Sequence, residues 1–169
     1  MGSILDNQGY PEPNQALPYL TIKYEFGGRD ALFPLNPAEI TGDINVDRNS
    51  VYLQKLTAGT MITLDQNGYV KVCDGSTEDP LAFLILSVLA PAFENQPALA
   101  SERVSGLWGG NLIETNAIAD EDIVPGDVLY CSAEGLLTKT APRTDAAIVG
   151  RARTANSTEN KTVLVQAIL

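Results

Sequence analysis

The sequence has no histidine and only two cysteines in 169 residues. The absence of histidine excludes Ser-His-Asp and Cys-His catalysis and removes the commonest zinc ligand. The spacing of Cys73 and Cys131 matches no metal or redox motif. We therefore expect both cysteines to pack as small, buried or half-buried apolar side chains, with a disulfide as the alternative.

Positive charge is also scarce, because the sequence has 11 Lys and Arg residues and 21 Asp and Glu residues, which gives a net charge of -10. Nucleic-acid binding draws most of its nonspecific affinity from Lys and Arg, so this charge argues against direct contact with nucleic acid. The longest apolar stretch, residues 81–93, is broken by Ser87 and Pro91 and is too short to span a bilayer. The first residues show neither the basic nor the apolar region of a secretory signal. We expect a protein without membrane contact or Sec-type secretion.

Known ligand-binding motifs are absent as well. The sequence has no Walker loop and no dinucleotide fingerprint, and Gly27-Gly28 and Gly109-Gly110 lack the strand-to-helix context of a phosphate cradle. We interpret both glycine pairs as turns. No pair of carboxylates stands out as a catalytic dyad, so we predict no enzymatic activity and no cofactor.

Two acidic segments match cation sites only in part. The segment 43–49 begins with the D-x-N-x-D spacing of a calcium loop, but Arg48 stands where such loops have glycine, and Gln54 where they have a bidentate glutamate. The other segment, 120–122, places three acids in a row, which is typical of a solvated loop. We predict no metal site.

What the sequence does contain is one stretch that occurs twice. Residues 56–71 return as 123–138, with equivalent positions 67 apart. Each copy reads as a glycine turn, a short β-branched strand, a polar turn with glycine and a second strand. Each then continues through a polar loop to an apolar strand, 81–86 in the first copy and 146–150 in the second. The matches are turn glycines and apolar positions, so duplication of a three-strand module and convergent hairpin patterning both explain them.

The pattern from residue 51 onward predicts an all-β fold, because short apolar and β-branched segments alternate with Gly, Pro or Asn. Two modules can bury their apolar faces against each other, which neither can do alone. We expect a small β-barrel or sandwich built from two similar hairpin modules over residues 51–169, with a long loop at 90–101. The expected strands are 51–56, 60–65, 69–73, 81–89, 104–108, 111–115, 127–132, 135–139, 147–153 and 162–168.

Four glycines are expected to shape the turns of the two modules. They are Gly59, Gly68, Gly126 and Gly135. Asn67-Gly68 is the favoured pair for a type I′ turn, and Gly68 and Gly135 should both have positive φ.

Residues 1–50 have a different composition and are expected to form an extended N-terminal arm and a connection. Prolines recur over residues 11–18 and disfavour helix and ladder alike. Residues 19–26 alternate as a strand but have no neighbouring hairpin. Such a strand must pair with the body of its own domain or with another chain, and we favour an interaction role. Residues 29–50 are expected to form a connection with at most one short helical turn near 36–39.

Aromatic residues gather in the arm, where a purely solvated tail would have little use for them. The only tryptophan is flanked by glycines and is either a core residue, an interface anchor or a carbohydrate-stacking platform. The candidate contact residues of the arm are Tyr10, Tyr19, Leu20, Ile22, Tyr24 and Phe26, and Trp108 is the alternative.

The two hairpin segments, followed by I-V-G-R-A and a terminal V-L-V-Q-A-I-L, resemble tailed-bacteriophage head decoration proteins, also called capsid cement proteins. The resemblance covers residues 51–169. The proline-rich arm is similar in kind to extensions that some such proteins lay across neighbouring subunits. The matching residues are Gly126, Asp127, Val128, Gly135, Gly150, Arg151 and Ala152, with looser matches at Gly59, Ile62, Gly68 and Val70.

The resemblance implies a nonenzymatic virion protein, made in the host cytoplasm, that binds the outer surface of a phage capsid and adds contacts between its subunits. The implied partners are the major capsid protein and further copies of the chain, in a trimer or dimer. The acidic charge suits an outward position, because a subunit that faces packaged DNA would be repelled. A carbohydrate-binding or host-attachment β module that uses Trp108 is the alternative function, and an enzyme that uses carboxylates alone is a third.

Overall fold

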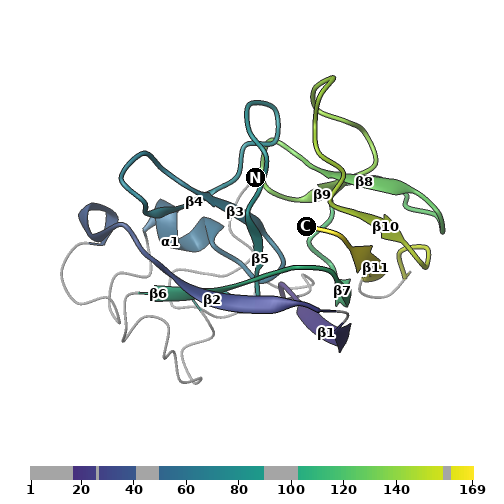
Figure 1. Ribbon diagram of the computed structural model, residues 1–169, viewed down its shortest axis with the longest axis horizontal. Coiled ribbons are helices and arrows are strands. Elements are labelled where there is room, and N and C mark those ends of the chain that lie inside the picture. Colours follow the sequence, from purple (N-terminus) through teal and green to yellow (C-terminus); the bar gives the residue numbers. More distant parts are fainter. Residues whose placement is uncertain (1–16, 26, 41–49, 90–102, 158–160) are drawn as a thin grey trace.

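The computed structural model describes residues 17–25, 27–40, 50–89, 103–157 and 161–169, which form a nearly all-β structure (Figure 1). Its helical elements are a 3-10 helix, η1 (Pro37–Glu39), and a short α-helix, α1 (Val51–Lys55). The strands form two antiparallel sheets, and the described strands close neither of them into a barrel. The all-β prediction is confirmed, and of the two expected forms the closed barrel is not found among the described strands.

The two sheets share a common strand plan. The five-stranded sheet has the order β2-β6-β5-β3-β4, and the six-stranded sheet has the order β1-β7-β11-β10-β8-β9. The five-stranded sheet consists of β2 (Arg29–Pro34), β3 (Met61–Leu64), β4 (Val70–Val72), β5 (Ala82–Leu84) and β6 (Arg103–Trp108). The six-stranded sheet consists of β1 (Leu20–Glu25), β7 (Asn111–Thr115), β8 (Val128–Cys131), β9 (Leu137–Thr138), β10 (Gly150–Ala152) and β11 (Val163–Ala167).

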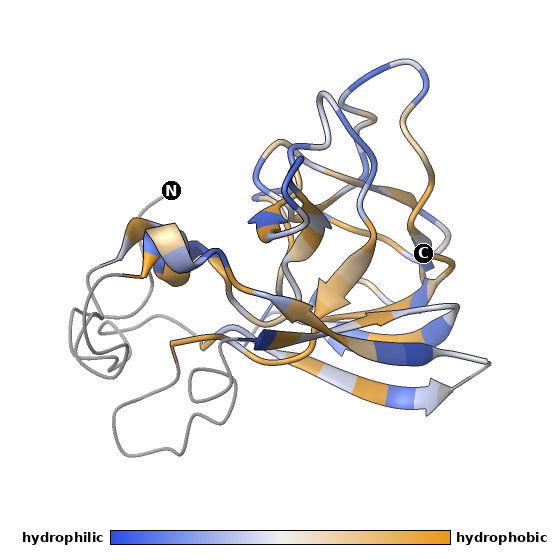
Figure 2. Ribbon diagram, turned by 60° about the vertical axis from the view of Figure 1, so that its left-hand side comes forward, coloured by the Kyte–Doolittle hydropathy of each residue, from blue (hydrophilic) through white to orange (hydrophobic). Residues whose placement is uncertain are grey.

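The larger core cluster takes buried side chains from both sheets. Met61, Phe83 and Leu107 come from the five-stranded sheet, and Ile113 and Val165 are among those from the six-stranded sheet. Successive side chains of a strand point to opposite faces, so these residues define the inner face of each sheet. Figure 2 shows the resulting alternation of hydrophobic and hydrophilic residues along the strands in the lower part of the view.

A second core cluster covers the opposite face of the five-stranded sheet. Ile62 and Leu84, which alternate with the residues of the first cluster, pack there with Leu53 and Leu56 and with Val88. The five-stranded sheet is therefore buried on both faces. One face meets the six-stranded sheet, and the other meets the segment of α1 and residues 86–89.

The two hairpins predicted from the repeat are present, and they share one register. β3 pairs Thr63 with Lys71 of β4, and β8 pairs Tyr130 with Thr138 of β9. Both partners of the second pair lie 67 positions after those of the first. The pairing of backbones, and not only the sequence pattern, is thus the same in the two copies.

The third strands also correspond. Met61 pairs with Phe83 in the first copy, and Val128 pairs with Arg151 in the second. Equivalent hydrogen bonds accompany these pairs, because the Leu84 N–H donates to the Thr60 carbonyl, and the Ala152 N–H to the Asp127 carbonyl. The third strand of the second copy lies one residue further along the chain than the 67-residue spacing requires.

The repeat is larger than the predicted three-strand module. In chain order, β2 to β6 and β7 to β11 occupy the same five positions of their sheets, since β2-β6-β5-β3-β4 corresponds to β7-β11-β10-β8-β9. We refer to residues 29–108 as repeat 1 and to residues 111–167 as repeat 2. β1 is an added strand outside this plan, on the free side of β7.

The first hairpin turn differs from the predicted type I′ turn. The Asp65 N–H donates to the Tyr69 carbonyl over 2.8 Å, and the Gly68 N–H donates to the Asp65 carbonyl over 3.0 Å. Lys161 is the only non-glycine residue of the described chain with a positive φ, so Asn67 lacks the conformation that type I′ requires. The Asp65 carboxylate accepts from the Asn67 and Tyr69 N–H groups and holds a three-residue loop with glycine at its last position.

The second hairpin turn repeats this arrangement with serine in place of aspartate. The Ser132 N–H donates to the Leu136 carbonyl, and the Gly135 N–H donates to the Ser132 carbonyl. The Ser132 hydroxyl accepts from the Glu134 and Leu136 N–H groups. Side chains that are not identical therefore make the same turn, which explains why the sequence match is confined to glycines and apolar positions.

The strand predicted at 51–56 is wrong, because this segment forms α1. The Ser50 hydroxyl accepts from the Leu53 N–H and caps the helix. Leu53 and Leu56 lie three positions apart and are both buried, which is a helical spacing. The residues that were taken for a strand thus place one apolar side on the five-stranded sheet.

The connection predicted over 29–50 contains a strand, β2, that the sequence reading missed. Asp30 and Pro34 argue against a central strand, but β2 lies at the edge of its sheet, where proline is tolerated. The helical turn predicted near 36–39 is confirmed as η1. A domain boundary at residue 50 does not fit the sheets, because β1 and β2 pair with β7 and β6.

One expected strand is shorter than predicted, and two expected loop segments lie outside the described residues. The strand expected at 81–89 is confined to β5, and the Val88 N–H donates to the Leu56 carbonyl instead of continuing the ladder. The loop at 90–101 and the segment 43–49 are not among the described residues. No described helix has the length and apolar character needed to cross a membrane.

Candidate functional site

β1 and β2 form one long ladder with β6 and β7 that passes from one sheet into the other. β1 pairs with β7, from Leu20 opposite Thr115, and β2 pairs with β6, ending at Pro34 opposite Arg103. Figure 1 shows β2 and β1 following one another along the lower part of the molecule. The strand predicted to lack a local partner therefore pairs within its own chain.

Glycines make the bend in this ladder, which corrects their interpretation as turns. Gly27, Gly109 and Gly110 have φ values of 107°, 94° and 88°. A Cβ on Gly109 would lie 3.0 Å from the Gly27 carbonyl oxygen and 3.4 Å from the Gly28 Cα. Both the backbone conformation and the close approach of the two strands require glycine here.

Among the described strands, β1 and β2 are each the last of their sheet, and we call their outward side the outer edge. The Ile85 N–H donates to the Ser105 carbonyl, so Ser105 directs its backbone groups toward β5. The direction of the backbone groups alternates along an antiparallel strand, so the next residue, Gly106, directs its groups toward its partner Ala31 in β2. The N–H and C=O groups of Asp30 and Leu32, on either side of Ala31, therefore point outward. The outer edge thus presents backbone donors and acceptors to a further strand.

The two halves of the outer edge differ in how open they are. β1 carries a bulge between Ile22 and Tyr24, and Lys23 lies there with its ammonium 3.9 Å from Glu114. Bulges and lysines are features that protect an edge from pairing. β2 has no bulge and no lysine, its protecting Pro34 stands at its last position, and Leu32 is 58% exposed. The β2 half is therefore the better site for an added strand.

The structure separates the predicted contact residues of the arm. Leu20 is buried in the core and is not available to a partner, whereas Ile22 is half-buried against the core cluster. Tyr19 is held by its backbone, which bonds to Asn116 and Thr115. Tyr24 is 61% exposed and remains a contact candidate. Tyr10 and Phe26 lie outside the described residues.

Trp108 is partly buried at the end of β6. Its ring meets the edge of the Phe33 ring at a centroid distance of 6.2 Å and an interplanar angle of 62°. Phe33 in turn covers Gly106, where a Cβ would lie 2.5 Å from the phenyl ring. This aromatic pair gives Trp108 a packing role, and its use as a platform for a sugar remains a prediction.

The four predicted turn glycines all have the left-handed conformation. Gly59, Gly68, Gly126 and Gly135 have φ values of 86°, 84°, 92° and 77°. The prediction of positive φ at Gly68 and Gly135 is confirmed. Their surroundings differ, because Gly68 has open space around it, whereas Gly135 lies against Met61 and Val72 of repeat 1.

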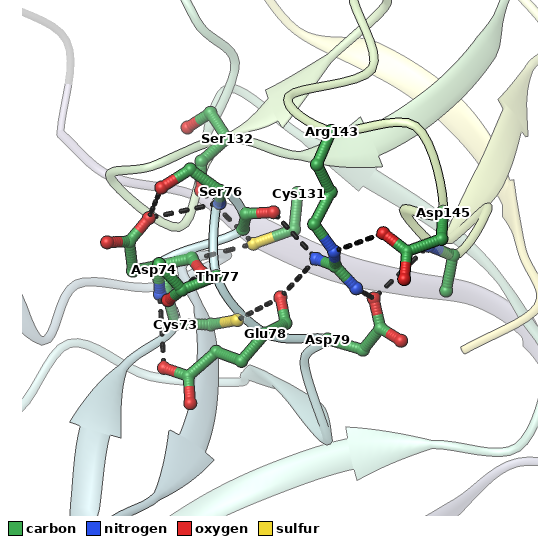
Figure 3. Close-up of polar contacts among 12 residues, drawn as sticks. Cys73, Asp74, Ser76, Thr77, Glu78, Asp79, Cys131, Ser132, Arg143 and Asp145 are labelled. Atoms are coloured by element: carbon green, nitrogen blue, oxygen red, sulfur yellow. Dashed lines mark hydrogen bonds and ion pairs between the residues drawn. The ribbon is translucent and has the colours of Figure 1, made fainter.

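A second candidate region joins the two repeats, and we call it the inter-repeat junction (Figure 3). It consists of residues 73–79 of repeat 1 and residues 131–132 and 143–147 of repeat 2. The Arg143 side chain is only 19% exposed and donates to the carbonyls of Gly75 over 2.8 Å and Glu78 over 2.9 Å. The same guanidinium bonds to the carboxylates of Asp79 and Asp145. One side chain of repeat 2 thereby fixes a loop of repeat 1.

The charges of the junction reinforce each other. The Ala147 N–H and the Arg143 guanidinium both donate to the Asp79 carboxylate and hold its pKa below the usual value. Asp79 in turn raises the pKa of Arg143. The sequence offered no signal for this contact, because Arg143 lies in a polar loop far from residues 75–79 along the chain.

We expect Arg143→Lys to lower the melting temperature and Arg143→Ala to lower it further, because lysine cannot present a planar fork to several carbonyl and carboxylate oxygens. Asp79 has a lowered pKa in the folded state, so its contribution to stability is present above the unfolded pKa of about 4 and is lost as pH falls through the folded value. The difference in melting temperature between wild type and Arg143→Ala should therefore become smaller at acidic pH. Thermal unfolding at several pH values measures the loss of stability and its pH dependence, and Arg153→Lys, at an exposed position, is the control. Equal melting temperatures of wild type and Arg143→Ala at neutral pH would contradict a stabilising role of Arg143.

The described residues contain no cluster of three or more potential metal-ligating side chains. The acids at 120–122 are in the described chain and form no such cluster. The calcium-like segment 43–49 falls outside it. The prediction that the protein binds no metal remains a prediction.

No protein-family model matches the chain, and no curated protein matches it significantly. The chain's own geometry and charge are therefore what support a function.

Proposed function

We propose that this protein is a structural virion component that binds the outer surface of a phage capsid and stabilises it by added contacts between subunits. The observation that carries the proposal is the outer edge, where β2 leaves backbone groups and the Leu32 side chain open to a partner. Strand addition at such an edge supplies hydrogen bonds from the backbone and specificity from alternate side chains. The two facing sheets, which we interpret as a sandwich, hold this edge in place.

The proposed mechanism is the addition of binding energy to an assembled lattice. A ligand that binds the assembled lattice better than its separated subunits stabilises the lattice by mass action. Many moderate contacts suffice when each particle offers many equivalent sites. A preformed ladder also loses less conformational entropy on binding than a disordered segment would.

The net charge of -10 supports an outward location. A subunit between the capsid and packaged DNA would be repelled by the phosphates, whereas an outward subunit gains mutual repulsion between particles. The proposed partners are the major capsid protein and further copies of the chain, in a trimer or dimer. The proposal includes synthesis in the host cytoplasm and involves no catalysis, nucleic acid or membrane.

We expect Leu32→Glu to reduce occupancy on phage particles by about tenfold, because it places a charge at the open part of the outer edge. Val124→Glu is the matched control, since Val124 is a 53% exposed apolar residue beside β8 and away from this edge. Co-sedimentation with particles of the phage that encodes the chain measures occupancy, and thermal unfolding verifies that both variants fold.

Equal loss of occupancy in the two variants, or full occupancy of Leu32→Glu, would remove the outer edge from the capsid contact. Failure of the wild-type protein to bind particles would remove the proposed function itself. A glycan-array signal that Trp108→Ala abolishes, with unchanged melting temperature, would replace it with the carbohydrate-binding alternative.

A further inference from the structure

The two cysteines come from different repeats and are both deeply buried. Cys73 follows β4 in repeat 1 and is 0% exposed, and Cys131 ends β8 in repeat 2 and is 3% exposed. Both are free thiols. The expectation of buried, unlinked cysteines is confirmed, but the fold brings them together, which their separation of 58 positions did not indicate.

The thiols lie side by side in the inter-repeat junction. The Cys131 Sγ is 3.8 Å from the Cys73 carbonyl oxygen, and the Cys73 Sγ is 3.6 Å from the Glu78 carbonyl oxygen. Figure 3 shows the sulfur atoms of Cys73 and Cys131 close to each other in the middle of the junction. The neighbouring Cys73 side chain and burial both raise the pKa of Cys131.

The backbones beside the thiols are already in contact. The Gly75 N–H donates to the Ser132 carbonyl over 2.9 Å. A Cβ on Gly75 would lie 1.8 Å from the Cys131 carbonyl oxygen, so only glycine permits this approach. A disulfide needs two backbones within a narrow range of separation and two side chains directed at each other. In the junction, the Cys131 Sγ lies 3.8 Å from the Cys73 carbonyl oxygen, so the two residues are direct neighbours.

We propose that Cys73 and Cys131 are a latent crosslink between the repeats that closes by exchange with a small-molecule disulfide such as oxidised glutathione. The thiolate of one cysteine attacks the glutathione disulfide and releases one reduced glutathione. The thiolate of the other cysteine then attacks the protein–glutathione disulfide, forms the Sγ–Sγ bond and releases the second. The protein is oxidised by two electrons, and its two thiol protons end on the two molecules of reduced glutathione.

The surroundings of the thiols set when this reaction occurs. Both thiols are buried, and the raised pKa of Cys131 leaves little thiolate at that residue, so exchange requires local opening of the junction. Once formed, the bond joins residues 58 positions apart and restricts the unfolded chain. A last consequence rests on the proposed virion function. The thiols of a virion protein stay reduced in the host cytoplasm, and the crosslink forms after release into oxidising surroundings.

The test uses the full chain, reduced and then incubated with oxidised glutathione, with and without urea at concentrations below the unfolding transition. The samples are quenched with acid, unfolded and alkylated, and intact mass is recorded. We expect the urea-assisted product to be a monomer that has lost two hydrogen atoms and takes up no alkylating agent. Its melting temperature should rise by about 10 °C and return to the starting value with dithiothreitol.

Cys73→Ala and Cys131→Ala are the controls, because each keeps one thiol and should show no rise in melting temperature. Two alkylated cysteines after the urea-assisted incubation would overturn the proposal. A stable glutathione adduct or a disulfide between chains as the main product would also overturn it. The assay contains no particles, so its outcome is independent of whether the protein binds a capsid.

Discussion

Gly135→Ala should lower the free energy of unfolding by about 3 kcal/mol, whereas Gly68→Ala should lower it by about 1 kcal/mol. The two glycines occupy equivalent turn positions and have similar φ values of 77° and 84°. An alanine therefore meets the same backbone strain at both positions. The larger effect at Gly135 comes from its surroundings.

A Cβ on Gly135 would lie 2.8 Å from the Met61 carbonyl oxygen and 2.8 Å from the Val72 Cγ1. Met61 also donates its N–H to the Gly135 carbonyl over 2.8 Å, so the turn cannot move away without loss of that bond. At Gly68 no atom lies within 4 Å of the added Cβ. The pair thus separates backbone strain from steric overlap.

Chemical denaturation of the wild type and the two alanine variants measures the free energy of unfolding. The loss in Gly68→Ala gives the cost of backbone strain, and the additional loss in Gly135→Ala gives the cost of steric overlap. Equal destabilisation of the two variants would show that the turn of repeat 2 can shift away from repeat 1. In that case the contact of Gly135 with β3 would contribute little to holding the repeats together.

The sequence predicted the hairpins well because local chemistry determines them. Turn glycines, alternating apolar residues and a polar residue such as Asp65 or Ser132 are enough to define a three-residue loop and its flanking strands. The sequence did not predict the full five-strand repeat. β2 and β7 differ in their side chains, and their equivalence lies in the position each takes in its sheet, which only long-range pairing reveals.

α1 shows a different limit of the sequence. The segment 51–56 is apolar enough to pass for a strand, and a short apolar run does not by itself distinguish the two structures. Ser50 as a cap and the spacing of Leu53 and Leu56 were the signals for a helix. The helix cap supplied by Ser50 therefore prevails over the β propensity of Val51 and Tyr52.

The candidate sites were predicted least well, because each depends on segments that are distant in sequence. The outer edge exists only because β1 and β2 pair with strands about 80 residues later, and such pairing leaves no local pattern. Arg143 and the two cysteines meet across the repeats for the same reason. The short apolar run of Ala31, Leu32 and Phe33 was the signal that would have found the β2 half of the outer edge.

Deletion of residues 1–16 should leave the fold intact, whereas deletion of residues 1–25 should lower the free energy of unfolding by about 4 kcal/mol. Among the described residues, all members of both core clusters and both sheets lie from Leu20 onward. The longer deletion removes the six residues of β1, their five paired positions with β7 and the buried side chain of Leu20. It also leaves β7 as a new open edge, which favours aggregation.

The shorter deletion separates the roles of the arm and of the outer edge in particle binding. If the segment that carries Tyr10 contacts the capsid as predicted, the 1–16 deletion variant should melt as the wild type does and lose about tenfold in occupancy on particles. Thermal unfolding and co-sedimentation on the same preparation measure the two quantities. Full occupancy with native stability would exclude residues 1–16 from the contact and leave the outer edge, tested by Leu32→Glu, as the surface that binds. Loss of occupancy in both variants, with native melting in both, would instead mean that the capsid is held by two separate parts of the chain, so that each contributes to the avidity of the whole.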